Sequence, residues 1–369
     1  MRPTFAEINL SHLKLNYLNI RKKCKSKVMA VVKADAYGHG MIECAKALST
    51  LEEKKPEYYG VALTEEAIEL RKAKVVKEPI VVFGPFNNDE LNDYLKFNII
   101  PTVSTNEQLG FLKKYSGKKT LKIHINIDTG MGRVGIRFNE AVDFIKKISE
   151  LNSVIIDGIY THFATSDEAD KEYANLQLQR FKNVVSELKQ AGINYGLAHS
   201  ANSGAILDMP NAVFDMVRPG ISLYGYYPSL ETTESIKLKP VMSLYSKITT
   251  IREVAKGESV SYGRKFIAKK KTLAATVPIG YADGFVRNLT NESKAIIKGC
   301  FCNQIGRVTM DRVLYDVTNS NAKVGDKVII LGKNKDKNVD AWNWSKLLDT
   351  IPYEITCNIS KRVPRVYKR

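Results

Sequence analysis

A lysine stands at the end of an otherwise apolar run near the start of the chain. The segment reads Ala30-Val-Val-Lys33-Ala-Asp35-Ala-Tyr37-Gly-His-Gly40, and an apolar strand gives a lysine no structural reason to be there. The ordinary alternative is a long side chain that snorkels to water or pairs with Asp35. Burial lowers the pKa of an amine, and a neutral amine can form a Schiff base with an aldehyde. Lys33 is therefore a candidate to hold an aldehyde cofactor, with Tyr37 near enough to share the site.

Polar residues also interrupt the apolar pattern where several later predicted strands end. In Asp128-Thr-Gly-Met-Gly-Arg133, glycines let the backbone turn tightly and return an arginine to the strand end. A lone histidine is more often structural than catalytic, but two histidines at corresponding strand ends favour a shared site. The candidates of this kind are Arg133, His162, His199, Ser203, Arg218, Gly220 and Ile221.

The elements that would position these residues alternate between short β-rich runs and amphipathic stretches through about residue 225. Such alternation is typical of repeated βα units and a parallel sheet. Capping residues followed by acidic residues support helix starts at Thr64, Asn88 and Thr105. Eight expected strands predict a (β/α)8 TIM-like barrel. They cover residues 28–33, 59–62, 80–83, 99–103, 121–127, 154–161, 195–199 and 214–218.

The pattern of the chain changes after about Pro240. Short β-like runs with turn residues between them occupy the rest, and the polar segment 231–240 lies at the change. We therefore expect a barrel domain over residues 1–236 and a mainly β domain over residues 237–369. The first ~10 residues could pack with the second domain.

In a (β/α)8 barrel, the active site lies at the carboxyl ends of the strands, and the loops after strands seven and eight commonly bind phosphate. Those loops offer Ser203, Arg218 and the backbone at Gly220. A Schiff-base lysine, a phosphate cradle across the mouth and an arginine near them together describe a site for pyridoxal 5'-phosphate (PLP).

Ordered motifs in both halves of the chain resemble those of the alanine racemase family. The Lys33 segment is similar to the family's PLP-lysine signature, which usually carries Asn where this chain has Asp35. Each short match is weak alone, but their common order makes coincidence implausible. The other matches are Asp128-Thr-Gly-Met-Gly-Arg133, His199-Ser-Ala-Asn-Ser203, Arg218-Pro-Gly-Ile221, Val260-Ser-Tyr262-Gly, Ile279-Gly-Tyr281-Ala-Asp-Gly284, Gly306-Arg-Val-Thr-Met310-Asp311 and Tyr353-Glu.

The resemblance implies a two-base interconversion of L-alanine and D-alanine that supplies D-alanine for peptidoglycan. Lys33 would hold PLP and act as the base toward D-alanine, and Tyr262 of a second subunit would act toward L-alanine. Two bases suit racemisation, because a proton must leave one face of a planar carbanion and another must reach the opposite face. Arg218 would donate to the pyridine nitrogen, leave it without its own proton and so discourage transamination.

The resemblance also assigns supporting residues and a partner. His162 would orient Tyr262, and Arg133 would approach the phenolic oxygen of the cofactor. Because Tyr262 and Tyr281 would come from a second chain, the resemblance implies a head-to-tail homodimer whose monomers are inactive. The phosphate would be held by Tyr37, Ser203, the backbone at Gly220 and Ile221, and Tyr353. The substrate would be bound by Arg133, Tyr281, Met310 through its backbone, and Asp311.

One position departs from many family members. They carry a carbamylated lysine seven residues before the arginine, and this chain has Asn126 there, seven positions before Arg133. Asparagine cannot form a carbamate, although its amide oxygen can accept a bond from Arg133. An anion such as chloride could then supply the missing charge.

Other functions remain open at this stage. A serine-preferring or broad-specificity racemase is one, since a pocket discriminates a hydroxyl only modestly unless built for it; Tyr353 favours alanine. A PLP decarboxylase of similar architecture would need a Cys-Glu or Cys-Asp element where this chain has Tyr262 and Met310-Asp311. A non-catalytic PLP-binding protein would typically lack the second domain.

Composition excludes several classes. The net charge of +17 is spread over amphipathic segments instead of clustered, so we expect no nucleic-acid partner. No apolar run reaches the roughly 20 residues that span a bilayer, and we expect neither a membrane association nor a signal peptide. The irregularly spaced cysteines complete no metal site and suit a reducing cytoplasm. They are Cys24, Cys44, Cys300, Cys302 and Cys357.

Overall fold

The computed structural model describes residues 2–115 and 119–369. The chain forms two compact units. The barrel unit contains Leu13–Ala36 and Met41–Lys239, and the β unit contains the residues up to His12, the segment Tyr37–Gly40 and Pro240–Arg369. The chain therefore leaves the barrel unit briefly just after Lys33 and again at Pro240.

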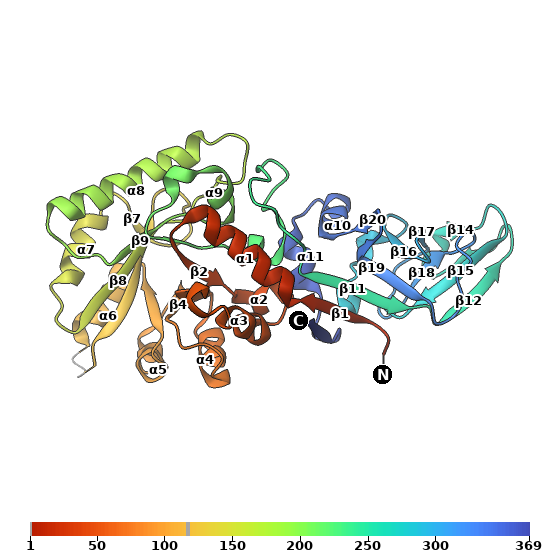
Figure 1. Ribbon diagram of the computed structural model, residues 1–369, viewed down its shortest axis with the longest axis horizontal. Coiled ribbons are helices and arrows are strands. Elements are labelled where there is room, and N and C mark those ends of the chain that lie inside the picture. The colour runs from red at the N-terminus through yellow and green to blue at the C-terminus, as the bar shows by residue number, and fades with distance from the viewer. Residues whose placement is uncertain (1, 116–118) are drawn as a thin grey trace. The chain divides into compact units, whose positions relative to one another are not determined.

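Parallel strands form the centre of the barrel unit, with helices outside them (Figure 1). Eight strands pair in the order β10-β2-β3-β4-β5-β6-β8-β9. The outermost two are linked through Asp215, whose N–H donates to Ala198 O at 3.0 Å and whose carboxylate accepts from Ala198 N–H at 2.8 Å. The predicted TIM-like barrel, nearly closed, is confirmed. Its strands are β2 (Lys27–Val31), β3 (Tyr58–Val61), β4 (Ile80–Pro85), β5 (Ile100–Val103), β6 (Leu121–Asp128), β8 (Val154–Tyr160), β9 (Leu197–His199) and β10 (Met216–Val217), and the short β7 (Ile136–Arg137) pairs with β6.

The helices can pack against the strands because apolar residues recur on one face of each helix. In α8, Leu178, Phe181, Val185 and Leu188 are buried at three- and four-residue spacing. The α-helices up to Pro240 are α1 (Leu10–Cys24), α2 (Lys33–Gly38), α3 (Met41–Ser49), α4 (Thr64–Ala73), α5 (Leu91–Phe97), α6 (Asn106–Lys114), α7 (Ala141–Ser149), α8 (Glu172–Gln190) and α9 (Ser203–Asp208).

The expected helix caps are correct at one of three positions. The Thr105 hydroxyl accepts from Gln108 N–H at 3.2 Å and caps α6. Thr64 is instead the first residue of α4, where the Glu66 carboxylate accepts from the Leu63 N–H at 3.1 Å. Asn88 likewise begins a short 3-10 turn one residue after its cap.

The barrel strands are buried on both faces, which is why they appear in the sequence as nearly continuous apolar runs. Met29, Val81, Ile100 and Met216 come from four different strands and form one buried cluster with Tyr58. Buried polar residues interrupt these apolar runs at several positions. Among them are His124, Asn126 and His199.

The β unit is built on a ten-stranded sheet, in the order β12-β15-β18-β17-β16-β19-β11-β1-β21 with β20 beside β19. The N-terminal strand β1 (Phe5–Asn9) pairs antiparallel with β11 and parallel with the C-terminal β21. This unit is mainly β, as predicted. Its other elements are β11 (Met242–Lys247), β12 (Thr250–Val254), β13 (Ser259–Val260), β14 (Phe266–Ile267), β15 (Thr272–Val277), β16 (Lys294–Ile297), β17 (Cys300–Ile305), β18 (Val313–Asp316), β19 (Lys327–Asn334), β20 (Lys337–Val339), α10 (Ala341–Leu348), α11 (Pro352–Asn358) and β21 (Arg365–Lys368).

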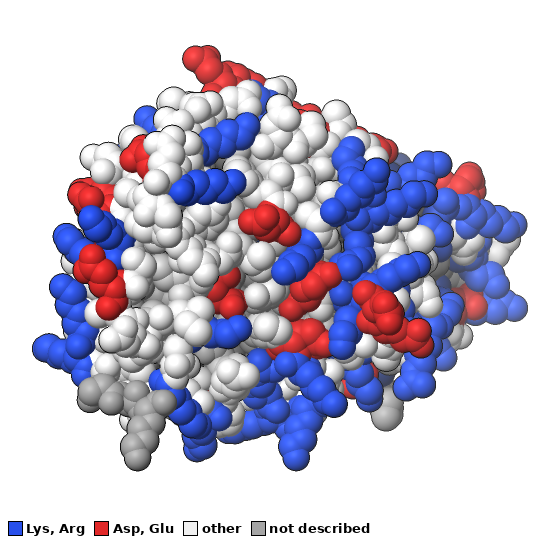
Figure 2. Space-filling view, turned by 60° about the vertical axis from the view of Figure 1, so that its left-hand side comes forward, with Lys and Arg blue, Asp and Glu red and all other residues white. Residues whose placement is uncertain are grey.

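Basic side chains cover much of the surface without forming one uniform field. Figure 2 shows Lys and Arg over the visible face with Asp and Glu between them. Within residues 2–115 and 119–369, no helix is both long and apolar enough to cross a membrane.

Candidate active site

Lys33 lies two residues after the last buried residue of β2, at the start of an unusual turn. Ala34, Asp35, Ala36 and Tyr37 have φ angles of 52°, 52°, 54° and 55°, so this single turn of α2 is left-handed. For residues other than glycine, a left-handed helical conformation costs roughly 1–2 kcal/mol each. Backbone strain of this kind collects at functional sites, where the surrounding structure must impose it.

Hydrogen bonds from the barrel unit hold this turn. The N–H of Ala34 donates to the Glu66 carboxylate at 2.6 Å, and the N–H of Ala36 donates to Val32 O at 2.9 Å. The Asp35 carboxylate accepts from the N–H of Met41 at 2.8 Å, at the start of α3. Asp35 therefore caps the start of α3 in this chain.

Ser203 and the segment after β10 form a small polar cradle. The Ser203 hydroxyl accepts from the Gly220 N–H at 3.0 Å and from the Ser222 N–H at 3.4 Å, and it lies 3.0 Å from the Ser222 hydroxyl. Ile221 begins the short 3-10 turn that carries Ser222. Hydroxyl and backbone N–H groups gathered in this way are suitable donors to a phosphate. Sequence reasoning missed Ser222, although it directly follows the Arg218-Pro-Gly-Ile221 motif.

Arg218 is buried and fixed by several acceptors. Its Nη2 donates to Thr161 O at 2.7 Å and to Ser200 O at 3.1 Å, and its Nη1 lies 2.8 Å from Nδ1 of His199. Burial lowers the pKa of Arg218 to about 10, so the guanidinium remains charged at neutral pH. A positive donor without an acceptor atom is thus held rigidly inside the barrel.

His162 follows β8 and is surrounded by cations. Burial, together with Arg218, Arg133 and Lys33, lowers its pKa to about 3. The imidazole is therefore neutral at pH 7. This mutual influence also brings the predicted residues Lys33, Arg133, His162 and Arg218 into one electrostatic environment at the end of the barrel strands.

The loop that carries Arg133 is organised by Asp128. The Asp128 carboxylate accepts from the N–H groups of Gly130 at 2.9 Å and Gly132 at 3.0 Å, and its other oxygen lies 2.8 Å from Nη1 of Arg137. Although burial opposes it, these contacts lower the pKa of Asp128. Arg133 itself is exposed, and Gly132, at φ 69°, supplies the left-handed conformation that the turn requires.

Asn126 lies near this loop on β6. Its amide nitrogen donates to Val134 O at 3.4 Å. Across the described ranges no hydrogen bond joins Asn126 to Arg133, so the amide contacts the backbone of the loop and not its guanidinium.

The β unit holds the other predicted residues. The rings of Tyr37 and Tyr353 lie 5.9 Å apart, tilted by 51°, so two of the predicted phosphate-binding tyrosines are neighbours. Tyr262 is exposed over 72% of its surface and follows Ser261, whose φ of 63° and ψ of 179° lie in a region nearly restricted to glycine. The Ser261 hydroxyl donates to Arg307 O at 2.6 Å.

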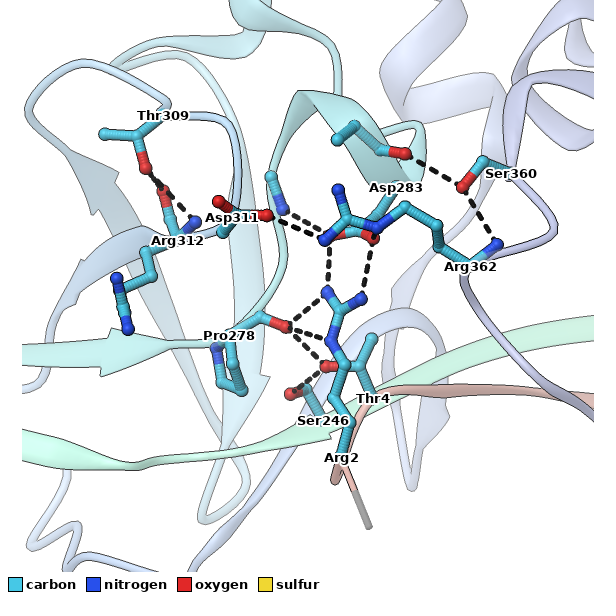
Figure 3. A network of polar contacts seen from close by, with 12 residues as sticks. Arg2, Thr4, Ser246, Pro278, Asp283, Thr309, Asp311, Arg312, Ser360 and Arg362 are labelled. Carbon is cyan, nitrogen blue, oxygen red and sulfur yellow. Dashed lines mark hydrogen bonds and ion pairs between the residues drawn. The ribbon is translucent and has the colours of Figure 1, made fainter.

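Asp283 anchors the turn that carries Tyr281, and Figure 3 shows its contacts with Arg2 and Arg362. Its carboxylate is fully buried and accepts from both terminal nitrogens of Arg2, with Nη1 at 2.7 Å from Oδ1. It also accepts from the Gly280 N–H at 3.0 Å. Nε of Arg362 lies 3.4 Å from Oδ1, so two arginines face one carboxylate.

The Tyr281 turn contacts the turn that carries Met310. The Tyr281 N–H donates to Thr309 O at 3.0 Å, and the Ala282 N–H donates to Met310 O at 3.2 Å. A Cβ at Gly280 would lie 2.2 Å from Thr309 O, so only glycine permits this approach. Asp311 accepts from Nη2 of Arg362 at 2.7 Å, which links both predicted substrate-binding turns to the Asp283 network.

The predicted residues are thus divided between the two units. The barrel unit holds Lys33, Arg133, His162, Ser203, Arg218, Gly220 and Ile221, and the β unit holds Tyr37, Tyr262, Tyr281, Met310, Asp311 and Tyr353. In the part of the chain that the structure describes, no three His, Cys, Asp or Glu residues group as metal ligands.

A (β/α)8 barrel with a lysine after one strand, a fixed arginine and a hydroxyl cradle, joined to a β unit with exposed tyrosines, defines a two-domain enzyme of the barrel class. The family models for the alanine racemase N-terminal domain and C-terminal domain match residues 8–228 and 241–367. The chain belongs to the alanine racemase family.

Relatives match along the whole chain. An alanine racemase of Halothermothrix orenii is 42% identical over 372 residues, covering 100% of this chain and 97% of the relative. The solved alanine racemase of Clostridium difficile 630 has 40% identity and a TM-score of 0.91, covering 100% and 96% of the two chains. The Bacillus anthracis structure with bound L-Ala-P has 35% identity and a TM-score of 0.92, with the same coverage.

Proposed function

We propose that this chain is a PLP-dependent alanine racemase that interconverts L-alanine and D-alanine, supplies D-alanine for peptidoglycan and works as a homodimer. The observation that carries the proposal is the buried, charged Arg218 beside the Lys33 turn and the Ser203 cradle in one barrel unit. Agreement in name among relatives that cover the full chain supports it. We also propose the cytoplasm as its location, where the free cysteines would stay reduced.

The residues of the barrel unit fit PLP by their chemistry. The amine of Lys33 suits an aldehyde, and the Ser203 hydroxyl with the backbone at Gly220 and Ile221 suits a phosphate. Arg218 can only donate, so it suits a pyridine nitrogen that accepts. In the β unit, Tyr37 and Tyr353 would add phenol groups to the phosphate site. When bound, PLP would supply the electron sink that makes the Cα–H bond of alanine acidic.

Two bases would move the proton. Lys33 Nζ would take or return it on one face of Cα, and the Tyr262 oxygen would do so on the other. The exposure of Tyr262 supports its delivery to a second copy of the chain. His162, neutral at pH 7 because burial and nearby cations lower its pKa, would accept or donate a hydrogen bond that orients the partner's tyrosine.

Exposed residues of the β unit would complete the substrate site of the second copy. Tyr281 and Met310 are 43% and 52% exposed, although their backbones are fixed to each other. Because Met310 O already accepts from Ala282, its N–H is the group we assign to the substrate carboxylate. Arg133 and Asp311 would line the approach, and Arg133 would also face the phenolic oxygen of the cofactor.

A racemisation assay on purified chain supplied with PLP tests the proposal. L-alanine, L-serine and L-lysine are offered separately, and the D-enantiomer is measured by chiral chromatography. We expect D-alanine, with kcat/KM for alanine at least about tenfold above that for serine. Comparable values would assign a broad-specificity racemase instead. Absence of D-alanine, or release of carbon dioxide from any substrate, would exclude alanine racemisation as the main activity.

A further inference from the structure

A line of polar side chains passes through the interior of the barrel unit, beginning at Arg218. Nη1 of Arg218 lies 2.8 Å from Nδ1 of His199, and Nε2 of His199 lies 3.0 Å from Nδ1 of His124. Nε2 of His124 in turn faces Oδ2 of Asp157 at 3.5 Å. Both histidines are fully buried, in a position where barrel strands normally carry branched apolar residues.

The donors and acceptors of this line can be arranged in only one direction. A guanidinium can only donate, so Nδ1 of His199 must accept and its proton must be on Nε2. That N–H donates to Nδ1 of His124, which places the proton of His124 on its Nε2. Each tautomer therefore follows from its neighbour, and the last N–H of the line faces the carboxylate of Asp157.

The contact between His124 and Asp157 is electrostatic, because Oδ2 of Asp157 lies 3.5 Å from Nε2 of His124 and no hydrogen bond joins the two atoms. The Tyr58 hydroxyl donates to its Oδ2 at 2.8 Å, and Nζ of Lys122 lies 3.0 Å from its Oδ1. Although burial raises the pKa of this carboxyl group, His124, Tyr58 and Lys122 outweigh that effect and lower it overall. Asp157 is thus an anion at neutral pH. Burial lowers the pKa of both histidines, which are neutral there.

The absence of a side chain at Gly158 leaves space for the ring of His124. Gly158 pairs with His124 between β8 and β6, and a Cβ at position 158 would lie 2.8 Å from Cε1 of the His124 ring. On the other side, the ring of Tyr160 stacks on His199 with centroids 5.0 Å apart and an interplanar angle of 18°. Both imidazoles are therefore held in place by neighbours as well as by hydrogen bonds.

We propose that His124 and Asp157 are positioning residues that hold His199 in its neutral Nε2–H form, and through it fix the guanidinium of Arg218. If His199 had its proton on Nδ1, two donors would face each other 2.8 Å apart in a buried place, and Arg218 would have to move. The effect on catalysis rests on the proposed function, in which Arg218 contacts the pyridine nitrogen. The effect on the tautomer of His199 is independent of the proposed function.

The first test reads the tautomer directly, without turnover. The full chain is labelled with 15N-histidine, with and without PLP, and long-range 1H–15N spectra identify which ring nitrogen carries the proton. We expect His199 to be protonated on Nε2 alone. In His124→Leu, which removes the acceptor, we expect the Nδ1–H form to appear. His124→Gln can accept from His199 and donate toward Asp157, so it should retain the single form. A wild-type Nδ1–H form, or no change in His124→Leu, would overturn the proposal.

The second test measures what the line does for the reaction. In His124→Leu we expect kcat to fall about tenfold with KM within about twofold, because such partners act behind a contacting group. Pyruvate released per racemisation event should rise about tenfold, because a displaced Arg218 no longer disfavours transamination. His124→Gln should restore both values to within about threefold. If kcat and the pyruvate ratio changed equally in the Gln and Leu variants, these side chains would act only through packing, and the proposal would be overturned.

Variants at Asp157 and Lys122 distinguish the effect of the carboxylate that faces His124 from the effect of a neighbouring cation. Asp157→Leu should reproduce the His199 tautomer change of His124→Leu. Lys122→Met removes an exposed cation beside the same carboxylate and should leave the tautomer and the pyruvate ratio unchanged. A tautomer change in Lys122→Met, or none in Asp157→Leu, would contradict the role of Asp157. If the wild type keeps the expected tautomer but does not racemise alanine, the proposed function fails and this structural assignment does not.

Discussion

Arg2 and Asp283 lie 281 positions apart in the chain, and the guanidinium of Arg2 donates two hydrogen bonds to the buried carboxylate of Asp283. Nε and Nη2 of Arg2 also donate to Pro278 O at 3.1 and 2.7 Å. The second residue of the chain thereby holds the turn that presents Tyr281. Figure 3 shows this contact between Arg2 and Asp283.

Replacing Arg2 should destabilise the β unit and weaken substrate binding. Arg2→Met leaves Asp283 with the Gly280 N–H and the more distant Arg362, and we expect a loss of roughly 2 kcal/mol in the free energy of unfolding. KM for alanine should rise more than kcat falls, because Tyr281 is displaced. Arg2→Lys keeps the charge but not the two-point contact, so it should lie between. Urea unfolding and steady-state kinetics check this; identical stability in wild type and Arg2→Met would refute it.

The backbone of Ser261 should tolerate glycine better than alanine. Its conformation is nearly restricted to glycine, while its hydroxyl donates to Arg307 O. Ser261→Gly loses the bond but relieves the strain, whereas Ser261→Ala loses the bond, about 1 kcal/mol, and keeps the strain. We therefore expect the Gly variant to be the more stable of the two and to retain more activity, since Tyr262 directly follows. Denaturation midpoints and kcat of the pair decide it, and an alanine variant equal to the glycine variant would show that strain is unimportant here.

Sequence reasoning found the site residues that break an apolar pattern. Lys33 and Arg218 end predicted strands and Ser203 follows one, and the barrel rule places such residues at one end of the barrel. It could not find the left-handed turn at residues 34–37, because Ala-Asp-Ala-Tyr contains no glycine and local preference favours the right-handed form. Tertiary contacts, such as that of Ala34 with Glu66, impose the turn.

The interior line from Arg218 to Asp157 also escaped the sequence. His124 and Asp157 lie within strands, where their types look like isolated polar residues. Their proximity depends on the register between β6 and β8, which shifts between Ile123 and His124. Register is set by pairing between distant segments and leaves no local trace in a single sequence.

Activity should not depend on bicarbonate. Asn126 stands where many family members carry a carbamylated lysine, and its amide contacts Val134 O. Removing carbon dioxide from the buffer should therefore leave kcat unchanged. Asn126→Lys is the matched variant, which could form a carbamate and should acquire a bicarbonate dependence. Assays in degassed buffer with and without added bicarbonate, at constant chloride, check this. A fall in the wild-type rate on degassing would be incompatible with it.

Two inactive variants should restore activity when mixed if Tyr262 serves the second copy. Lys33→Ala and Tyr262→Phe each remove one base and should lose most activity as homodimers. A mixed dimer has one site with both bases and one with neither, so random mixing should recover about a quarter of wild-type activity. Subunits are mixed, dissociated by dilution and reassembled before the assay. If the mixture were no more active than the two variants assayed separately, Tyr262 would serve the site of its own subunit. Full activity in a demonstrated monomer would exclude the requirement for a dimer.

Acid should destabilise the chain partly through His162. Its pKa in the folded chain is about 3, whereas an unfolded histidine titrates near about 6.5. Between these values the unfolded chain binds one more proton than the folded chain, so stability is complete above about pH 6.5 and falls as the pH decreases toward about 3. The slope contributed by this residue is at most about 1.4 kcal/mol per pH unit.

His124 and His199 act in the same direction, because burial lowers the pKa of each. His162→Gln cannot titrate, so its unfolding free energy should fall less steeply than that of the wild type between pH 6 and 4.5, and the two should run parallel above pH 7.5. Urea unfolding at intervals across this range measures both slopes; parallel curves down to pH 4.5 would mean that His162 becomes protonated in the folded state as readily as in the unfolded chain.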